Sequence, residues 1–243
     1  IVQLVDQLRT DIDADTIIGI GIAATGVVED GVIRESTVLG WRDLDLRGML
    51  ERRFGFPVTI SNDVVCSMLA ERFFGHGDKS MLFIKIDRGI GAATLIDDVT
   101  VIGQNHAGGE IGHISLDPES GVLCPCGKRG CLETMVTSPV IRERIRRAST
   151  PEEQLDIIRS CGEQLAAALA MPIGLLDIND ICVYGPPDIV NAAFLEATQR
   201  RVDMVSSSKF HKHTSVRRCQ VGSDIALRGS AIDVVHHYIE NGH

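Results

Sequence analysis

The sequence lacks any apolar run that approaches the roughly 18 residues needed to cross a membrane as a helix. Its longest apolar stretches, residues 17–28 and 165–176, are shorter and contain glycine or proline. The start of the chain also lacks a basic segment followed by an apolar core, so no secretory signal peptide is expected. These absences predict a cytoplasmic protein with no membrane partner.

Basic residues are also few. The chain has 24 Lys and Arg against 33 Asp and Glu, which gives a net charge of −9. A nucleic-acid surface needs clustered basic side chains to neutralise phosphates. We therefore expect these 243 residues to make no DNA contact of their own. The length is sufficient for one large domain or two modest lobes.

Disulfide pairing is not indicated either, because the seven cysteines are an odd number. Four of them are scattered through apolar or helical segments, which fits a reducing compartment better than a secreted disulfide scaffold. These four are Cys66, Cys161, Cys182 and Cys219.

The other three cysteines, Cys124, Cys126 and Cys131, lie close together and are interleaved with proline and glycine. Such spacing predicts a tight knuckle that offers three thiolates. A tetrahedral zinc needs a fourth ligand, and His113 lies eleven residues upstream of the first cysteine. We predict a structural zinc held by these four residues. The alternative is three free or disulfide-paired thiols.

Apolar periodicity predicts an α/β protein in which buried strands alternate with helices. Strands are expected at 17–23, 57–60, 81–86, 181–184 and 217–222. Helices are expected at 1–10, within 41–56, from 62 or 63 to 74, from 138 to 147, from 150 to about 170, at 189–201 and at 226–238. The helix within 41–56 should bury Leu46, Met49, Leu50 and Phe54. Ser138 should be a helix N-cap, as should Asn62 or Asp63.

The motif GGEIGH at 108–113, followed by CxCGxxGCLE at 124–133, resembles the signature of the ROK family, named for repressors, open reading frames and kinases. The resemblance implies that Glu110, His113 and Glu133 contact a sugar. It also implies that one ring nitrogen of His113 faces the zinc while the other faces a sugar hydroxyl. A metal would fix the tautomer and orientation of that ring.

The ROK resemblance implies a two-lobed, actin-like (ribonuclease-H-like) fold. Residues 1–72 with 223–243 would form a smaller, partial lobe, with N-terminal strands apparently missing. Residues 73–222 would form a larger lobe with the zinc knuckle and a dimerisation surface. Asn62 and Asp63 match a pair that contacts the sugar, and in the family's kinases the aspartate is the general base towards ATP.

An ATP and Mg²⁺ site is less well supported by the sequence. The family's early Asp-x-Gly-x-Thr element is absent, and its Gly-Thr-Gly loop reads Arg88-Gly89-Ile90-Gly91, with isoleucine in place of the hydroxyl. Its late Gly-Gly turn reads Gly185-Pro186-Pro187, and two prolines remove two backbone donors. A strand-connecting turn is then the better interpretation of 88–91.

Residues 40–46 and 70–75 resemble the family's regulators more than its kinases. We therefore expect the effector-binding and oligomerisation part of a ROK-type transcriptional regulator, dimeric or tetrameric, with a sugar or sugar phosphate as effector. DNA would be bound by an N-terminal domain that these residues do not include. One alternative is an ATP-dependent hexose or N-acetylhexosamine kinase whose first strands precede Ile1, with Asp63 as its base. Another is a regulator that binds a protein partner instead of a sugar.

Overall fold

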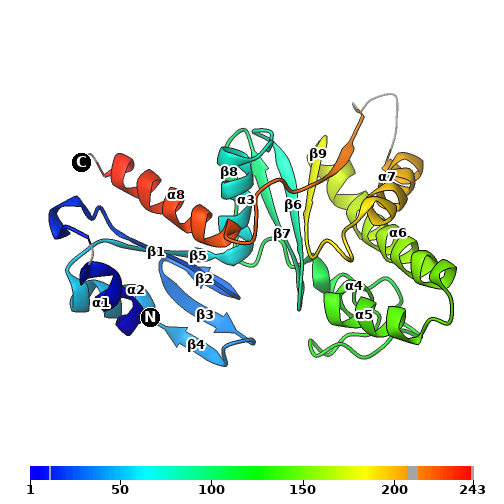
Figure 1. Cartoon of the computed structure of the whole chain (residues 1–243), viewed down its shortest axis with the longest axis horizontal. Helices are drawn as coiled ribbons and strands as arrows, with labels where there is room; N and C mark the ends of the chain where they lie inside the picture. Colours follow the sequence, from blue (N-terminus) through cyan, green and yellow to red (C-terminus); the bar gives the residue numbers. More distant parts are fainter. Residues whose placement is uncertain (11, 207–212, 242–243) are drawn as a thin grey trace. The chain divides into compact units, whose positions relative to one another are not determined.

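A computed structural model describes residues 1–10, 12–206 and 213–241 of the chain (Figure 1). The chain divides into two compact units, the first made of Ile1–Phe74 with Val221–His243 and the second of Gly75–Gln220. The sequence placed these borders at 72/73 and 222/223. Within the described ranges, no helix is long and apolar enough to span a membrane.

The first unit contains two small sheets. In one, β1 (Ile20–Ala24) pairs in parallel with β5 (Val58–Asn62). In the other, β2 (Val27–Glu29), β3 (Val32–Ser36) and β4 (Trp41–Leu44) form an antiparallel meander. Asp30 and Gly31 have positive φ angles of 49° and 77°, as a two-residue type I′ hairpin turn between β2 and β3 requires.

Four helices and one short 3₁₀ turn complete this unit. They are α1 (Val2–Thr10), η1 (Ala14–Thr16), α2 (Leu46–Phe54), α3 (Asp63–Phe74) and α8 (Ile225–Glu240). Helix α8 packs against both strands of the parallel pair and against α3. Leu46, Leu50 and Phe54 of α2 enter a core with Ile33 and Val58.

The second unit is built on a five-stranded mixed sheet in the order β10-β9-β6-β7-β8. Strands β6 (Met81–Ile86), β7 (Ile90–Ile96) and β8 (Val99–Val101) form an antiparallel meander. Strands β9 (Asp180–Tyr184) and β10 (Ser215–Arg218) extend the sheet in parallel with β6.

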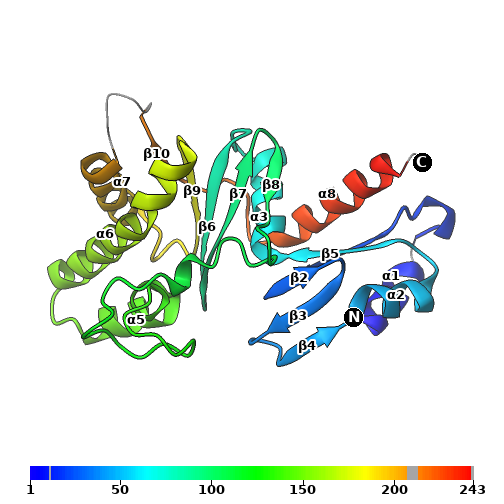
Figure 2. The same ribbon diagram turned by 180° about the vertical axis from the view of Figure 1, so that it is seen from behind.

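Helices α6 (Pro151–Leu176) and α7 (Ala192–Ser206) pack side by side next to this sheet, as Figures 1 and 2 show from opposite sides. The shorter elements η2 (Ile111–His113), α4 (Glu133–Val136) and α5 (Ser138–Arg147) lie between β8 and α6 in the chain. Apolar side chains from the sheet and from α4 to α7 share one large core, which includes Ile84, Val183, Leu165 and Phe194.

The helix predicted within 41–56 is α2, but the sequence did not predict the strand before it. Residues 41–44 form β4 because they pair with β3, and Arg42 makes a cross-strand ion pair with Glu35 at 2.9 Å. Met49 is 51% exposed, so its expected burial was wrong. The strand expected at 217–222 is β10, which ends at Arg218.

Several helix boundaries were also wrong. Helix α7, expected at 189–201, is Ala192–Ser206. Helix α6 continues six residues beyond the expected end near 170, through Pro172, because Ile173 is buried in the core of the second unit. Ser138 is the first helical residue of α5 rather than its cap, and the cap position is Thr137.

The ion pair between Asp180 and Arg217 joins two strands of the sheet and is mostly buried. The carboxylate of Asp180 at the start of β9 accepts two hydrogen bonds from the Arg217 guanidinium of β10, at 2.7 and 2.9 Å. It also accepts one from the backbone N–H of Asp78 at 3.1 Å. The two side chains are 12% and 21% exposed.

We expect Asp180→Ala to lower the free energy of unfolding by roughly 3 kcal/mol, because it removes a mostly buried ion pair and its two hydrogen bonds. Asp188→Ala is the matched control. Asp188 also binds an arginine, Arg142, through two hydrogen bonds, but both side chains are more than half exposed. Urea unfolding should show a large shift for the first variant and little for the second. Equal shifts would contradict the role assigned to burial.

Candidate metal centre and sugar-binding residues

The turn that carries Glu110 and His113 lies directly on the backbone of strand β7. Gly109 has a φ of 95°, and a β-carbon there would lie 1.9 Å from the carbonyl oxygen of Ala92. A β-carbon on Gly112 would lie 2.4 Å from the carbonyl oxygen of Ile90. The Ala92 N–H donates to the Gly109 carbonyl at 2.8 Å. Only glycine permits this contact, so these two positions fix where the turn lies.

The knuckle predicted at 124–131 is a tight antiparallel loop. The Cys124 N–H donates to the Lys128 carbonyl at 2.8 Å, and the Gly127 N–H donates back to the Cys124 carbonyl at 2.9 Å. Gly130, with a φ of 64°, packs so closely on Asp117 that a β-carbon would lie 2.0 Å from its carbonyl oxygen.

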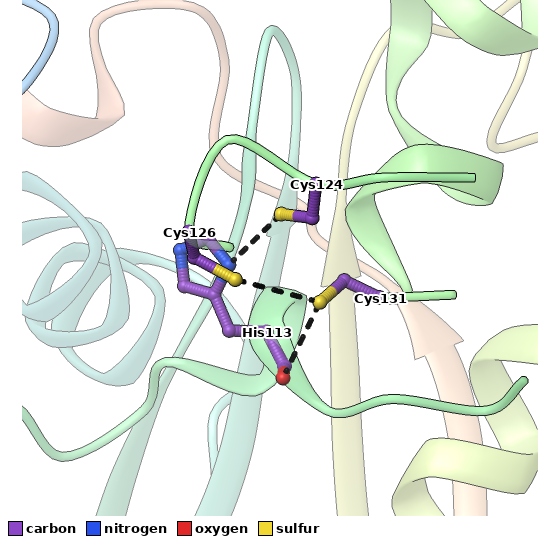
Figure 3. A group of neighbouring side chains, drawn as sticks. All are labelled: His113, Cys124, Cys126 and Cys131. Atoms are coloured by element: carbon purple, nitrogen blue, oxygen red, sulfur yellow. Dashed lines mark hydrogen bonds between the residues drawn. The ribbon is translucent and has the colours of Figure 1, made fainter. Parts of the chain in front are cut away.

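This geometry brings together all four side chains that the sequence predicted as metal ligands. One ligand atom from each of His113, Cys124, Cys126 and Cys131 lies within 4.8 Å of the others. Figure 3 shows the three sulfur atoms gathered beside the imidazole ring. The Cys124 Sγ lies 3.6 Å from His113 Nδ1, and the Cys126 and Cys131 sulfur atoms lie 3.6 Å apart.

The surroundings of the three thiols differ. Burial is the main reason that the pKa of the Cys124 thiol is raised to about 12. Burial also raises the pKa of the Cys131 thiol. Cys126 is exposed, and a hydrogen bond from the Lys128 backbone is the main cause that lowers its pKa to about 7. A metal would therefore have to displace protons from the two buried thiols.

The donor set fits zinc. Three thiolates and one imidazole form a Cys₃His set, which structural zinc sites use in tetrahedral geometry. Such a set is too soft for magnesium or calcium, which take oxygen ligands. The cluster can therefore hold a metal ion, and its identity as zinc stays a prediction.

Two predicted sugar-contacting carboxylates flank the ring of His113. Glu133, the first residue of α4, lies 3.5 Å from His113 Nδ1 and accepts a hydrogen bond from the Cys124 thiol at 3.0 Å. Glu110 lies on the other side, 3.9 Å from His113 Nε2. Nδ1 thus faces the thiols, while Nε2 faces an exposed carboxylate.

Sequence reasoning missed Lys128, whose Nζ donates to the His113 carbonyl at 2.7 Å. This contact ties the knuckle to the η2 turn. No signal in the sequence pointed to it, because a lysine in a glycine-flanked loop is ordinary.

The other two predicted sugar residues belong to the first unit. The Asn62 side chain accepts hydrogen bonds from the N–H groups of Val64 and Val65 at 2.8 and 3.3 Å. Its amide nitrogen donates to the Gly26 carbonyl at 2.9 Å. Asn62 therefore caps α3, as one of the two N-cap predictions had it. Asp63 is the first helical residue. Their contact with a sugar stays a prediction.

The segment expected to correspond to a phosphate loop is the turn between β6 and β7. Ile90 is the first residue of β7 and its side chain is 6% exposed, so it belongs to the core rather than to the loop. The turn exposes Asp87, Arg88 and Gly89 instead. The segment is a turn that connects two strands, as the sequence predicted.

Residues 1–235 match the ROK family. The chain belongs to this family. A glucokinase from Halalkalibacterium halodurans is 40% identical over 126 residues, which are 50% of this chain and 38% of the glucokinase. A putative xylose repressor from Caldicellulosiruptor sp. is 33% identical over 198 residues, which are 72% of this chain and 49% of the repressor. The chain thus spans about half or less of the length of these relatives.

Among solved structures, a ROK family transcriptional regulator, a homologue of the E. coli MLC protein, superposes with a TM-score of 0.84 at 23% identity. The match covers 97% of this chain and 66% of the regulator. ROK sugar kinases have the same fold, so the predicted actin-like α/β fold is confirmed. The relatives include both repressors and kinases and do not distinguish the two functions.

We expect the purified protein to hold about one zinc ion per chain, measured by inductively coupled plasma mass spectrometry. Cys131→Ser should remove most of it, because a serine hydroxyl is a poor zinc ligand at neutral pH. Zinc affinity should fall as the pH falls, since protons compete for the thiols. Cys161→Ser, which removes a buried thiol outside the cluster, is the control. A zinc-free protein that also fails to bind added zinc would contradict the metal centre.

We expect Gly109→Ala to reduce both zinc content and stability, because the added methyl group would collide with the Ala92 carbonyl at a left-handed backbone position. Gly89→Ala is the matched control, since no atom lies within 4 Å of a β-carbon built there. Zinc content and thermal unfolding of the two variants give the comparison. Unchanged zinc content in Gly109→Ala would show that the turn can move without loss of the site.

Proposed function

We propose that the chain is the effector-binding and oligomerisation region of a ROK-type transcriptional regulator that controls carbohydrate-use genes. Its effector is a sugar or a sugar phosphate. In this proposal DNA is bound by a different part of the protein, because the net charge of −9 argues against a DNA-binding surface on these residues. The assembly is a dimer or a tetramer.

One observation supports the proposal: three of the predicted sugar residues, Glu110, His113 and Glu133, lie together, while the turns expected to bind phosphate offer few donors. Glu110 and Glu133 offer carboxylates on either side of His113, as a ligand with vicinal hydroxyls would need. Carboxylates accept two hydroxyl hydrogen bonds each, and hydrogen bonds to charged groups are the stronger kind.

The turn after β9 is a poor phosphate site. Pro186 and Pro187 have no N–H groups to donate. The Pro186 carbonyl accepts from the N–H groups of Ile189 and Val190, at 3.0 and 2.9 Å. The guanidinium of Arg218 donates to the Gly185 carbonyl at 3.1 Å and to the Val190 carbonyl. These three donor groups are thus used within the protein.

The turn between β6 and β7 is equally unsuited to a phosphate. None of its three residues carries a hydroxyl, and the charge of Asp87 offsets that of Arg88 beside it. Loss of ATP use leaves a sugar sensor, which is what a regulator of carbohydrate genes requires.

Zinc, when bound, would supply a fixed charge and geometry that hold the imidazole in place. The chain's own residues do the rest of the recognition. With Nδ1 of His113 directed to the metal side, Nε2 can donate to or accept from a sugar hydroxyl next to Glu110. A ligand that binds one conformation of the protein better than another shifts the population of conformations, and this shift is the regulatory signal.

An ATP-dependent sugar kinase is the second candidate. It is favoured by the 40% identity to a glucokinase, although that match covers only 50% of this chain. In this reading, Asp63 takes the proton from the sugar hydroxyl that attacks the γ-phosphate of ATP, with Mg²⁺ bound to the nucleotide.

Isothermal titration with hexoses, pentoses, N-acetylhexosamines and their phosphates tests the sugar site. We expect one of these classes to bind, and Glu110→Gln to weaken that binding by about 10- to 100-fold, as the loss of a charged hydrogen bond predicts. Glu119→Gln is the control, an exposed glutamate of the same segment outside the cluster. The absence of binding across the whole panel would refute the proposal.

A coupled ADP-release assay on the full-length protein separates the two candidates. The regulator predicts sugar binding without ATP consumption. Turnover with any sugar in the panel, abolished by Asp63→Asn while sugar binding remains, would establish the kinase instead.

A further inference from the structure

Cys126 differs from every other cysteine of the protein. All seven cysteines lie in the described part of the chain, and six of them are buried while Cys126 is exposed. A dissolved oxidant therefore reaches its sulfur before the others. Oxidation of cysteine follows exposure and thiolate character, and a zinc-bound sulfur has thiolate character.

The sulfur of Cys131 is the nearest partner that the structure gives for Cys126, at 3.6 Å. Cys131 itself is fully buried, at 0% exposure. The Cys124 sulfur also lies within 4.8 Å, but its contacts are with Glu133 at 3.0 Å and with His113 at 3.6 Å. A disulfide from Cys126 would therefore form with Cys131.

The loop between these two cysteines can close the remaining distance. It has a glycine at each end, Gly127 and Gly130, with φ angles of 90° and 64°. A β-carbon built on Gly127 would meet no atom within 4 Å, so there is open space beside that residue. A disulfide needs its sulfurs about 2.05 Å apart. The required movement is thus a small adjustment at the exposed end.

We propose that Cys126 is an oxidation site and that peroxide converts Cys126 and Cys131 into a disulfide that expels the zinc. This inference rests on the zinc centre proposed above. The Cys126 thiolate attacks one oxygen of hydrogen peroxide, which breaks the O–O bond and gives a sulfenic acid and, after protonation, water. The Cys131 thiolate then attacks the sulfenic sulfur and displaces hydroxide, which is protonated to a second water. The two sulfurs lose two electrons, and the two peroxide oxygens gain them.

Oxidation removes two of the four zinc ligands at once. His113 and Cys124 alone cannot hold the ion tightly, since structural zinc needs four ligands. Release of the metal then frees the His113 ring, whose Nε2 faces Glu110 at 3.9 Å. Oxidation of the exposed thiol thereby weakens sugar binding through the metal and without any contact to the sugar.

The test exposes the zinc-loaded protein to hydrogen peroxide and follows released zinc with a chromogenic chelator. We expect about one zinc per chain to be released, with the disulfide between Cys126 and Cys131 recovered by peptide mass mapping. Reduction with dithiothreitol and added zinc should restore the metal. Cys161→Ser should release zinc at the wild-type rate.

Cys126→His sharpens the test, because histidine is a zinc ligand without sulfur. Among zinc-loaded chains of this variant, the rate of release should fall at least about tenfold, since the exposed thiol is gone. The peptide map of the oxidised wild-type protein identifies the disulfide whether or not the variant binds zinc. Zinc that stays bound under peroxide, or release with a disulfide elsewhere, overturns the oxidation site alone. A protein that never binds zinc overturns the metal centre and the oxidation site together.

Discussion

The candidate site depends on one steric constraint, the contact between a glycine-rich turn and the backbone of strand β7. Gly109 and Gly112 approach the carbonyls of Ala92 and Ile90 at distances that leave no room for a β-carbon. This contact places His113 at the surface of the large core rather than on a free loop. The knuckle folds back onto the same turn, because the Leu132 N–H donates to the Ile114 carbonyl at 2.9 Å. Strand β7, the glycine-rich turn and the cysteine knuckle therefore fix the positions of the site residues together.

His113 joins two kinds of chemistry through its two ring nitrogens. Nδ1 lies 3.6 Å from the Cys124 sulfur, and Nε2 lies 3.9 Å from the Glu110 carboxylate. A metal on the first nitrogen fixes the tautomer and the direction of the second. Structural zinc in this position would be a requirement for sugar recognition, even though it need not touch the sugar. A chemical change of the cysteine thiols would then alter how the imidazole ring of His113 is held.

How much of the structure can be predicted from the sequence depends on how close together in the chain the interacting residues lie. The four ligands of the metal cluster lie within 19 consecutive residues, from His113 to Cys131, so spacing alone could predict that they meet. Strand β4 could not be predicted, because its partner β3 decides its conformation. The passage of α6 through Pro172 likewise depends on the burial of Ile173 at 2% exposure. The need for glycine at position 109 could not be predicted from the sequence, because the carbonyl that leaves no room for a side chain is that of Ala92 in β7.

The choice between sensor and kinase depends on which backbone groups are free to bind a phosphate. A phosphate cradle needs several N–H groups directed at one point. After β9 the chain presents two prolines, and Arg218 is turned inward onto the carbonyls of Gly185 and Val190. Restoring a cradle here would require replacing the prolines and also releasing that arginine, so a single substitution would not suffice. The predicted sugar-binding residues need no such change, because Glu110, His113 and Glu133 already lie together on the second unit. This asymmetry favours a protein that binds a sugar without phosphorylating it.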